Sequence, residues 1–160
     1  MAIYVTTSRK PAPGTRSLAR WLARFLGGEC ENRGKRSLAE IVERAEAAGF
    51  KRLLFVYESH GNPSELSFYE EGWLSPVLKI KSVELPEKKA GRITPGEIRI
   101  VAEDAMGKKM APLFAVENSE ETDAVEMHLS RGAVVFELGG KKAAAIRLAG
   151  FGDVIESKRE

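Results

Sequence analysis

Residues 52–57 read Arg-Leu-Leu-Phe-Val-Tyr, a nearly continuous apolar run in a chain that is otherwise rich in charge. Successive side chains of a strand point to opposite faces of a sheet, so a strand that is apolar at almost every position is covered on both faces. The run therefore predicts a buried central strand, and the segments on either side are interpreted around it.

A helix is predicted immediately before this strand. Ser37-Leu38-Ala39-Glu40 has the spacing of a capping box, in which the serine oxygen and the glutamate carboxylate each accept a hydrogen bond from a free backbone N–H. The helix stops at Gly49, and its buried side is expected to consist of Leu38, Ile41, Val42 and Ala45.

The N-terminal part adds a strand and another helix. Residues 3–6 alternate and are rich in β-branched and aromatic side chains, which predicts a strand, and residues 7–14 contain the prolines and glycine of a loop. Apolar residues at helical spacing follow from Thr15 to the terminating Gly27-Gly28: Leu18, Trp21, Leu22, Phe25 and Leu26. Residues 29–32 are a short strand or a turn. This order favours a partly parallel sheet with helices on its faces.

Beyond residue 63 the pattern becomes typical of antiparallel strands, at 65–69 and 77–85. Residues 86–96, rich in proline, glycine and lysine, are the best candidate for a linker. Further strands are predicted at 98–101, 125–129, 133–138 and 143–148, with a helix near 105–114 and a frayed end at 156–160. The prediction is a single α/β domain over residues 1–160, with mixed sheets and helices in two halves, approximately 1–86 and 97–156.

The composition is that of an ordinary globular protein. Of the 160 residues, 43% are hydrophobic and 30% charged, and no apolar run approaches the ~20 residues that a membrane span needs. The single cysteine, Cys30, excludes an internal disulfide and indicates a reducing compartment. The N-terminus reads as a strand and not as a signal peptide, so the expected location is cytoplasmic. The absence of glutamine, with abundant Glu, Lys and Arg, is a thermophile-like composition.

Positive charge is concentrated at the N-terminal end. Residues 1–36 carry eight Lys or Arg against two Glu, a net of +6, although the whole chain has a net charge of only +2. Two basic loops, Ser8-Arg9-Lys10 and Asn32-Arg33-Gly34-Lys35-Arg36, each lead from a strand into a helix. Such loops gather at one edge of an α/β sheet, where helix N-termini with unpaired N–H groups suit phosphate. Ordinary solvated loops are the alternative.

A row of arginines extends this pattern. Arg16, Arg20 and Arg24 recur every four residues and therefore line one face of the first predicted helix. Guanidinium groups in a row can follow a sugar–phosphate backbone through bidentate contacts. The alternative is that they are simply the solvated side of an amphipathic helix.

Several enzyme motifs are absent. Gly34-Lys35 lacks the glycine five positions earlier and the Ser or Thr that a phosphate-binding P-loop requires, because Glu29 and Arg36 stand there. His60 and His128 have no metal-type spacing with carboxylates or with Cys30. The sequence thus predicts no catalytic residue, no metal, no cofactor and no small-molecule substrate.

Taken in order, these motifs resemble the short archaeal members of the Brix family. The pattern comprises Thr7-Ser8-Arg9-Lys10-Pro11, the arginine-rich helix, Asn32-Arg33-Gly34-Lys35, and a hydrophobic strand that runs into His60-Gly61-Asn62-Pro63. Arg92-Ile93-Thr94-Pro95-Gly96-Glu97 fits the same pattern, and the resemblance covers almost the whole chain.

The resemblance implies a non-catalytic role in ribosome biogenesis, with binding of rRNA or pre-rRNA and help in its processing or assembly. It also implies two halves, each similar to the anticodon-binding domain of class II aminoacyl-tRNA synthetases, and other assembly factors as further partners. Charge and resemblance together predict an RNA surface made of Arg9, Lys10, Arg16, Arg20, Asn32, Arg33, Gly34, Lys35 and Arg36.

Two other functions remain open from the sequence. A small α/β nucleotide-binding domain or enzyme could use the same basic edge, and a perturbed acid or base in a concave apolar pocket would favour it. A protein-interaction scaffold is the third interpretation, which salt-insensitive binding to a protein partner would favour.

Overall fold

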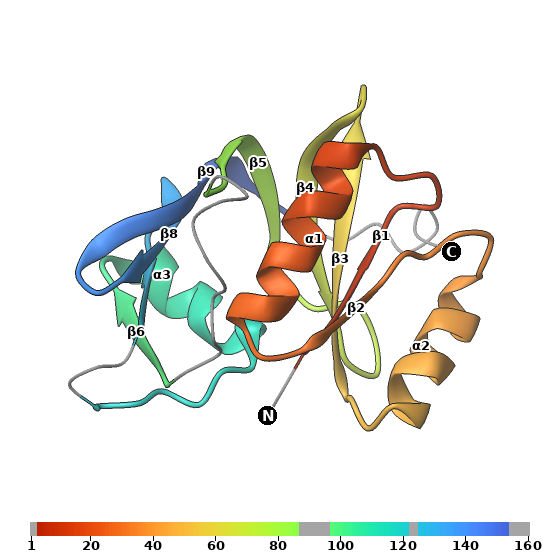
Figure 1. Ribbon diagram of the computed structural model, residues 1–160, viewed down its shortest axis with the longest axis horizontal. Coiled ribbons are helices and arrows are strands. Elements are labelled where there is room, and N and C mark those ends of the chain that lie inside the picture. The colour runs from red at the N-terminus through yellow and green to blue at the C-terminus, as the bar shows by residue number, and fades with distance from the viewer. Residues whose placement is uncertain (1–2, 87–96, 122–124, 154–160) are drawn as a thin grey trace.

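The computed structural model describes residues 3–86, 97–121 and 125–153. Apart from Pro86, the predicted linker at 86–96 lies outside the described residues, as does the predicted frayed end at 156–160. The fold is a mixed α/β arrangement around one nine-stranded sheet, with the strand order β2-β1-β3-β4-β5-β9-β8-β7-β6 (Figure 1).

The first half contains the predicted βαβ order. Its elements are β1 (Ile3–Thr7), α1 (Pro13–Phe25), β2 (Glu29–Glu31), α2 (Leu38–Ala47), β3 (Arg52–Ser59), β4 (Asn62–Tyr69) and β5 (Val77–Glu84). β1 lies between β2 and β3 and is parallel to both, whereas β4 and β5 continue the sheet in antiparallel order. The short segment at 29–32 is thus an edge strand, not a turn.

The second half repeats part of this order. Its elements are β6 (Ile98–Ala102), α3 (Ala105–Met110), the 3-10 helix η1 (Ala111–Phe114), β7 (Val125–Leu129), β8 (Ala133–Leu138) and β9 (Lys141–Gly152). β6 is parallel to β7, and β7, β8 and β9 are antiparallel neighbours. Because β5 pairs with β9, the mixed sheets predicted for the two halves are joined into a single sheet.

The two halves differ in the helices that cover the faces of the sheet. In the first half α2 packs against one face of β1 and β3, where Tyr4, Ile41, Ala45, Leu53 and Phe55 form a separate apolar cluster. The order β6-α3-η1-β7-β8-β9 has no helix or strand between α3 and β7 that corresponds to β2 and α2 in the described residues. The outer face of the second half therefore has no counterpart of α2 among the residues described.

The main core is built from both halves. Trp21 and Phe25 of α1 pack against Phe136 of β8, with ring centroids 4.6 and 4.7 Å apart. Conversely, Phe114 of η1 in the second half packs against Phe68 of β4 in the first half, with the ring centroids 5.0 Å apart. Each half therefore inserts an aromatic group from its helical segment against a strand of the other.

The helix boundaries follow from local chemistry. α1 begins at Pro13, two residues earlier than predicted, because a proline is well suited to the first turn, where its missing N–H has no acceptor. Predicted residues 105–114 divide into α3 and η1, and Pro112 lies at the start of η1. Gly28 after α1 is required by close packing, since a Cβ there would lie 1.8 Å from the carbonyl oxygen of Ile3.

Candidate nucleic-acid interface

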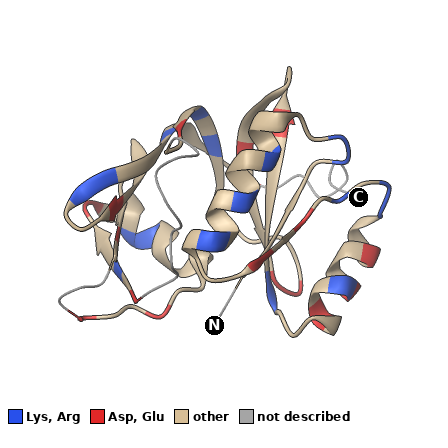
Figure 2. Cartoon of the chain, in the orientation of Figure 1, with Lys and Arg blue, Asp and Glu red and all other residues tan. Residues whose placement is uncertain are grey.

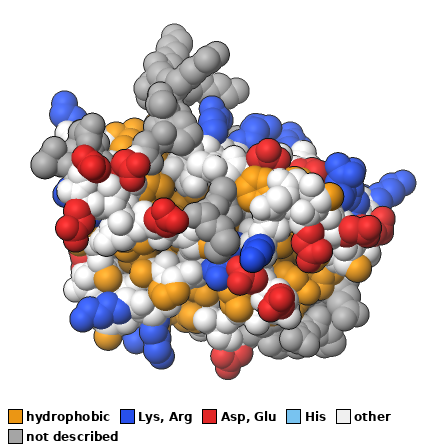
Figure 3. Space-filling model, turned by 90° about the horizontal axis from the view of Figure 1, so that it is seen from below, with side chains coloured by type: hydrophobic (Ala, Val, Ile, Leu, Met, Phe, Trp, Pro, Cys, Tyr) orange, Lys and Arg blue, Asp and Glu red, His pale blue; other side chains and the backbone are white. Residues whose placement is uncertain are grey.

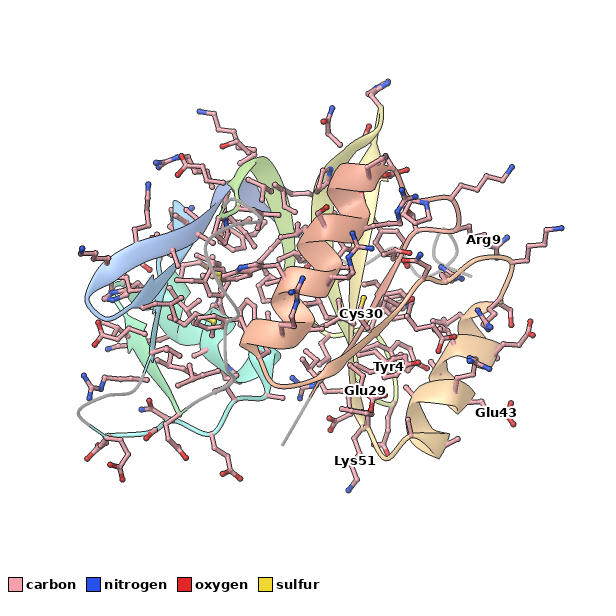
Figure 4. All side chains as sticks on the ribbon, viewed as in Figure 1. Tyr4, Arg9, Glu29, Cys30, Glu43 and Lys51 are labelled. Atoms are coloured by element: carbon pink, nitrogen blue, oxygen red, sulfur yellow. The ribbon has the colours of Figure 1, made fainter. Side chains whose placement is uncertain are left out.

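The two basic loops lie together at the carboxyl ends of β1 and β2. The parallel pairing of these strands brings their ends to the same edge, and the backbone N–H of Arg33 donates to Thr7 Oγ1 at 3.3 Å. Figure 1 shows both loops on the same side of the molecule, and Figure 4 shows Arg9 at its outer margin. The predicted meeting of the loops at one sheet edge is confirmed.

Side chains of the protein lie at both helix N-termini of this edge. Glu58 Oε2, at the end of β3, accepts from Ala12 N at 3.0 Å and from Thr15 Oγ1 at 2.6 Å. At α2 the predicted capping box is present, with Ser37 and Glu40 accepting from each other's backbone N–H. Glu58 thus engages the N-cap residue and a hydroxyl of α1, and the suitability of these helix N-termini for phosphate stays a prediction.

Replacing Glu58 with alanine is expected to destabilise the fold by about 1–2 kcal/mol, because its carboxylate joins Ala12 and Thr15 at the start of α1 to the end of β3 through two hydrogen bonds. Urea denaturation would measure this change. The matched control is Glu43→Ala on the exposed side of α2, with an expected change within about 0.5 kcal/mol. Equal effects of the two substitutions would show that Glu58 does not stabilise α1.

Arg33 is buried, unlike the other basic residues of these loops. Only 3% of it is exposed, and its guanidinium carbon lies 5.8 Å from the centre of the Phe55 ring. Its Nε donates to the carbonyl oxygen of Arg36 at 3.1 Å, across the turn in which Gly34 has a φ of 60°. Arg33 is thus placed to hold the loop in shape and does not present its guanidinium to solvent.

A glutamate in β2 ties the second loop to α2. Glu31 lies 3.3 Å from the Arg36 guanidinium and 2.5 Å from that of Arg44, and the Tyr4 hydroxyl donates to the same carboxylate. The hydrogen bond from Arg44 holds the pKa of Glu31 below its usual value, despite partial burial. Burial and the neighbouring Glu31 raise the pKa of Tyr4. The charge of Arg36 is therefore partly compensated.

The interaction of Glu31 should depend on pH in a defined direction. Because its folded-state pKa is lowered, its stabilising effect is full above the ordinary glutamate pKa of about 4.3 and is lost as the pH falls through the lowered value. We expect Glu31→Gln to lower the midpoint of thermal unfolding clearly at pH 7, with a difference from the wild type that shrinks toward pH 3. A difference that does not change with pH would contradict this assignment.

The predicted arginine row is present on α1. Arg20 and Arg24 are exposed, and Arg16 is half-buried and donates to the carbonyl oxygen of Pro11 at 2.9 Å. Arg16 therefore connects the row to the first basic loop. In Figure 2 the Lys and Arg positions of α1 are seen as blue bands on its ribbon.

Most of the remaining predicted residues are accessible. Arg9, Lys10, Asn32 and Lys35 are exposed, while Gly34 and Arg36 are half-buried. Within 3–86, 97–121 and 125–153, no ion pair engages Lys10, Arg20, Arg24 or Lys35. By contrast, the face seen from below in Figure 3 mixes acidic and basic side chains around hydrophobic groups.

One cluster escaped the sequence analysis. His128 lies among Glu103, Glu126 and Glu137, so the inference that it has no carboxylates at metal-type spacing is wrong. Partial burial lowers the pKa of His128, but the hydrogen bonds with Glu103 and Glu126 and the charge of Glu137 outweigh it and raise the pKa above its ordinary value. The sequence pattern that could have revealed the cluster is Glu126-Met127-His128, because residues two apart on a strand lie on the same face.

Two surface hollows lie in the first half. One, of about 540 Å³, lies between the end of α2 and the end of β4 and includes Phe50 and Tyr69, and another, of about 510 Å³, lies beside the start of α1 and includes Ser17 and Lys81. The enzyme or nucleotide-binding alternative, which a perturbed acid or base in such a pocket would favour, stays an alternative.

No known family model matches the sequence. Curated relatives do match parts of it. A probable Brix domain-containing ribosomal biogenesis protein of Methanosarcina barkeri is 49% identical over 69 residues, 43% of this chain and 42% of the relative. A protein of the same name from Methanothermobacter thermautotrophicus is 36% identical over 93 residues, 54% of this chain and 57% of the relative. The matched segment thus spans about half the length of these relatives.

Two solved structures are similar over nearly the whole fold. A probable ribosomal biogenesis protein from Aeropyrum pernix has a TM-score of 0.76 and 27% identity, and the match covers 96% of each chain. Mil, an archaeal Imp4-like protein, has a TM-score of 0.76 at 24% identity, with 95% of this chain and 99% of Mil covered. Among the described residues, no helix is long and apolar enough to cross a membrane.

Proposed function

We propose, from the premise that the chain resembles archaeal Brix-domain ribosomal biogenesis proteins in sequence and in fold, that it binds rRNA or pre-rRNA through the edge formed by its basic loops and α1. The observation that supports this most is the set of exposed cations on the two basic loops and along α1: Arg9, Lys10, Arg20, Arg24 and Lys35. RNA affinity depends strongly on such contacts to phosphate.

The dimensions suit a nucleic-acid strand. Arg16, Arg20 and Arg24 are spaced by four helical residues, so the row extends about 12 Å along α1. That length corresponds to roughly three to four nucleotides of one strand in a duplex. Arg16, beside Pro11, joins the row to the loop that carries Arg9 and Lys10, so a backbone that follows α1 would continue onto the loops.

In this proposal the predicted residues have two kinds of role. Arg33 shapes the second loop from inside, because it is buried against Phe55. The contacts to RNA come from Arg9, Lys10, Arg16, Arg20, Asn32, Gly34, Lys35 and Arg36, with Arg24 added from the helix row.

The proposal also covers the cellular role of the protein and its domain organisation. The chain assists processing or assembly of the RNA without catalysis, in the cytoplasm, together with other assembly factors. It acts as a single domain over residues 1–160, in halves of approximately 1–86 and 97–156. The shared order of a parallel strand pair followed by two antiparallel strands supports a likeness of each half to the anticodon-binding domain of class II aminoacyl-tRNA synthetases.

Crosslinking in cells, followed by sequencing of the bound RNA, tests this function. We expect rRNA or pre-rRNA segments to be enriched over total RNA, and the enrichment to fall when Arg9, Lys10, Arg20 and Lys35 are all replaced by glutamine. Crosslinks that follow RNA abundance, or that are unchanged in the substituted protein, would contradict it.

A further inference from the structure

We propose that Glu126, His128 and Glu137 form a binding site for a divalent transition-metal ion, with Zn²⁺ as the best-suited ion, on the outer face of the second half. The three residues each offer one ligand atom, and these atoms all lie within 4.8 Å of one another. The site is separate from the basic edge and is carried by different elements of the fold.

The pairing of two strands brings the ligands together. Glu126 and His128 are two residues apart on β7 and therefore share a face, while Met127 between them points into the core. Glu137 on β8 is the register partner of Glu126, so its carboxylate lies on the same face. Side chains from two neighbouring strands thus converge because of the antiparallel register.

The spacing is close to that of a metal site. His128 Nε2 lies 3.2 Å from Glu126 Oε1 and 2.9 Å from Glu137 Oε2. With metal–ligand bonds of about 2.1 Å, the ligand atoms of a tetrahedral Zn²⁺ site lie about 3.4 Å from one another. The two distances to His128 are therefore a few tenths of an ångström shorter than in such a site, and the two carboxylates lie within 4.8 Å of each other.

The imidazole is oriented by a fourth carboxylate. Oε1 of Glu103, the residue after β6, lies 2.8 Å from Nδ1 of His128. A carboxylate at Nδ1 fixes the tautomer that leaves the lone pair of Nε2 available to a metal, and it raises the basicity of the ring. Glu103 is thus a positioning residue, because Nε2 is the atom that faces both other carboxylates.

The local charge also favours a cation. Three carboxylates surround one imidazole, and the nearby guanidinium of Arg99 pairs with Glu126 Oε2 at 3.0 Å. Without a metal, a single N–H at Nε2 faces two carboxylate oxygens and can point at only one of them. A divalent ion would interact with both, at the expense of the imidazole proton.

The exposure of the site and the types of its ligands indicate which ion it would bind. His128 has 19% of its side chain exposed, on the face that has no counterpart of α2, so an ion can enter and keep a water as a fourth ligand. One imidazole and two carboxylates suit Zn²⁺, or Mn²⁺ as a second choice, whereas Mg²⁺ prefers an octahedron of oxygens.

The test is calorimetric titration of the tag-free, chelator-treated full-length protein with zinc chloride, with cobalt chloride as a spectroscopic probe of geometry. We expect one ion per chain and the visible absorption of tetrahedral cobalt. His128→Gln and Glu137→Gln should each remove this binding, and Glu103→Gln should weaken it by about 10- to 100-fold.

Two controls make the result decisive. Glu84→Gln, at a carboxylate that pairs with Lys142 and Arg147 instead, should bind the ion as the wild type does. Circular dichroism in the presence of chelator should show that each variant is folded, and Glu137→Gln is the variant to rely on if His128→Gln is not. Absence of stoichiometric binding by the wild type, or unchanged binding by folded Glu137→Gln, would overturn the proposal.

Discussion

Replacing Phe136 with alanine is expected to destabilise the protein by about 3–5 kcal/mol, the cost of emptying a fully buried aromatic site. Phe136 belongs to β8 of the second half, yet its ring packs edge-on against Trp21 and Phe25 of α1. The cavity would therefore open where the two halves meet, and its walls could collapse only by moving α1 away from the sheet.

The experiment also tests whether the halves unfold together. Trp21 contacts Phe136, but Trp73 packs against Phe55 and Tyr69 of the first half. In a Trp21→Phe background the fluorescence of Trp73 therefore reports on the first half, whereas circular dichroism reports on both. We expect urea unfolding of Phe136→Ala to shift to lower concentration equally by the two probes. Val135→Ala, on the outer side of the same strand, should cause a much smaller shift. A shift seen by circular dichroism alone would show that the second half unfolds independently.

The substitution of Arg9, Lys10, Arg20 and Lys35 by glutamine is expected to weaken binding of structured RNA by about a thousandfold at roughly 0.1 M salt. Each lost phosphate contact removes the release of about 0.7–0.9 counterions, and four contacts together give a factor of that order. All four residues are exposed, so the free energy of unfolding should change little.

A matched variant separates this effect from total charge. Lys108 and Lys109 are exposed on α3 in the second half, away from the basic loops (Figure 2). Their replacement by glutamine should reduce RNA affinity only slightly. Equal losses per charge removed in the two variants would show that the protein attracts RNA by its overall charge and has no defined binding edge.

The secondary structure could be predicted well because local signals decide it. The apolar run at 52–57 and the capping box at Ser37 each fix an element without reference to the rest of the chain, and both are present. Gly107 is a poor helix former inside α3, yet a Cβ there would lie 2.1 Å from the carbonyl oxygen of Leu129. It allows α3 to lie against β7, a contact that cannot be read from the sequence alone.

The candidate site could be predicted in outline but not in detail. The loops meet because β1 and β2 are parallel, which the strand–helix order indicates. The burial of Arg33 over Phe55 and the hydrogen bonds of Glu58 with the start of α1 depend on which side chains face each other across the edge. The cluster at His128 depends on the register of β7 with β8, and one residue of slip would separate it.

The salt dependence of RNA binding tests the central claim most directly. For the wild-type protein, the logarithm of affinity should fall linearly with the logarithm of salt concentration. Replacement of Arg9, Lys10, Arg20 and Lys35 by glutamine should make that slope shallower by about 3, while replacement of Lys108 and Lys109 should leave it nearly unchanged. Slopes that are the same in all three proteins would contradict a phosphate-binding edge formed by the basic loops and α1.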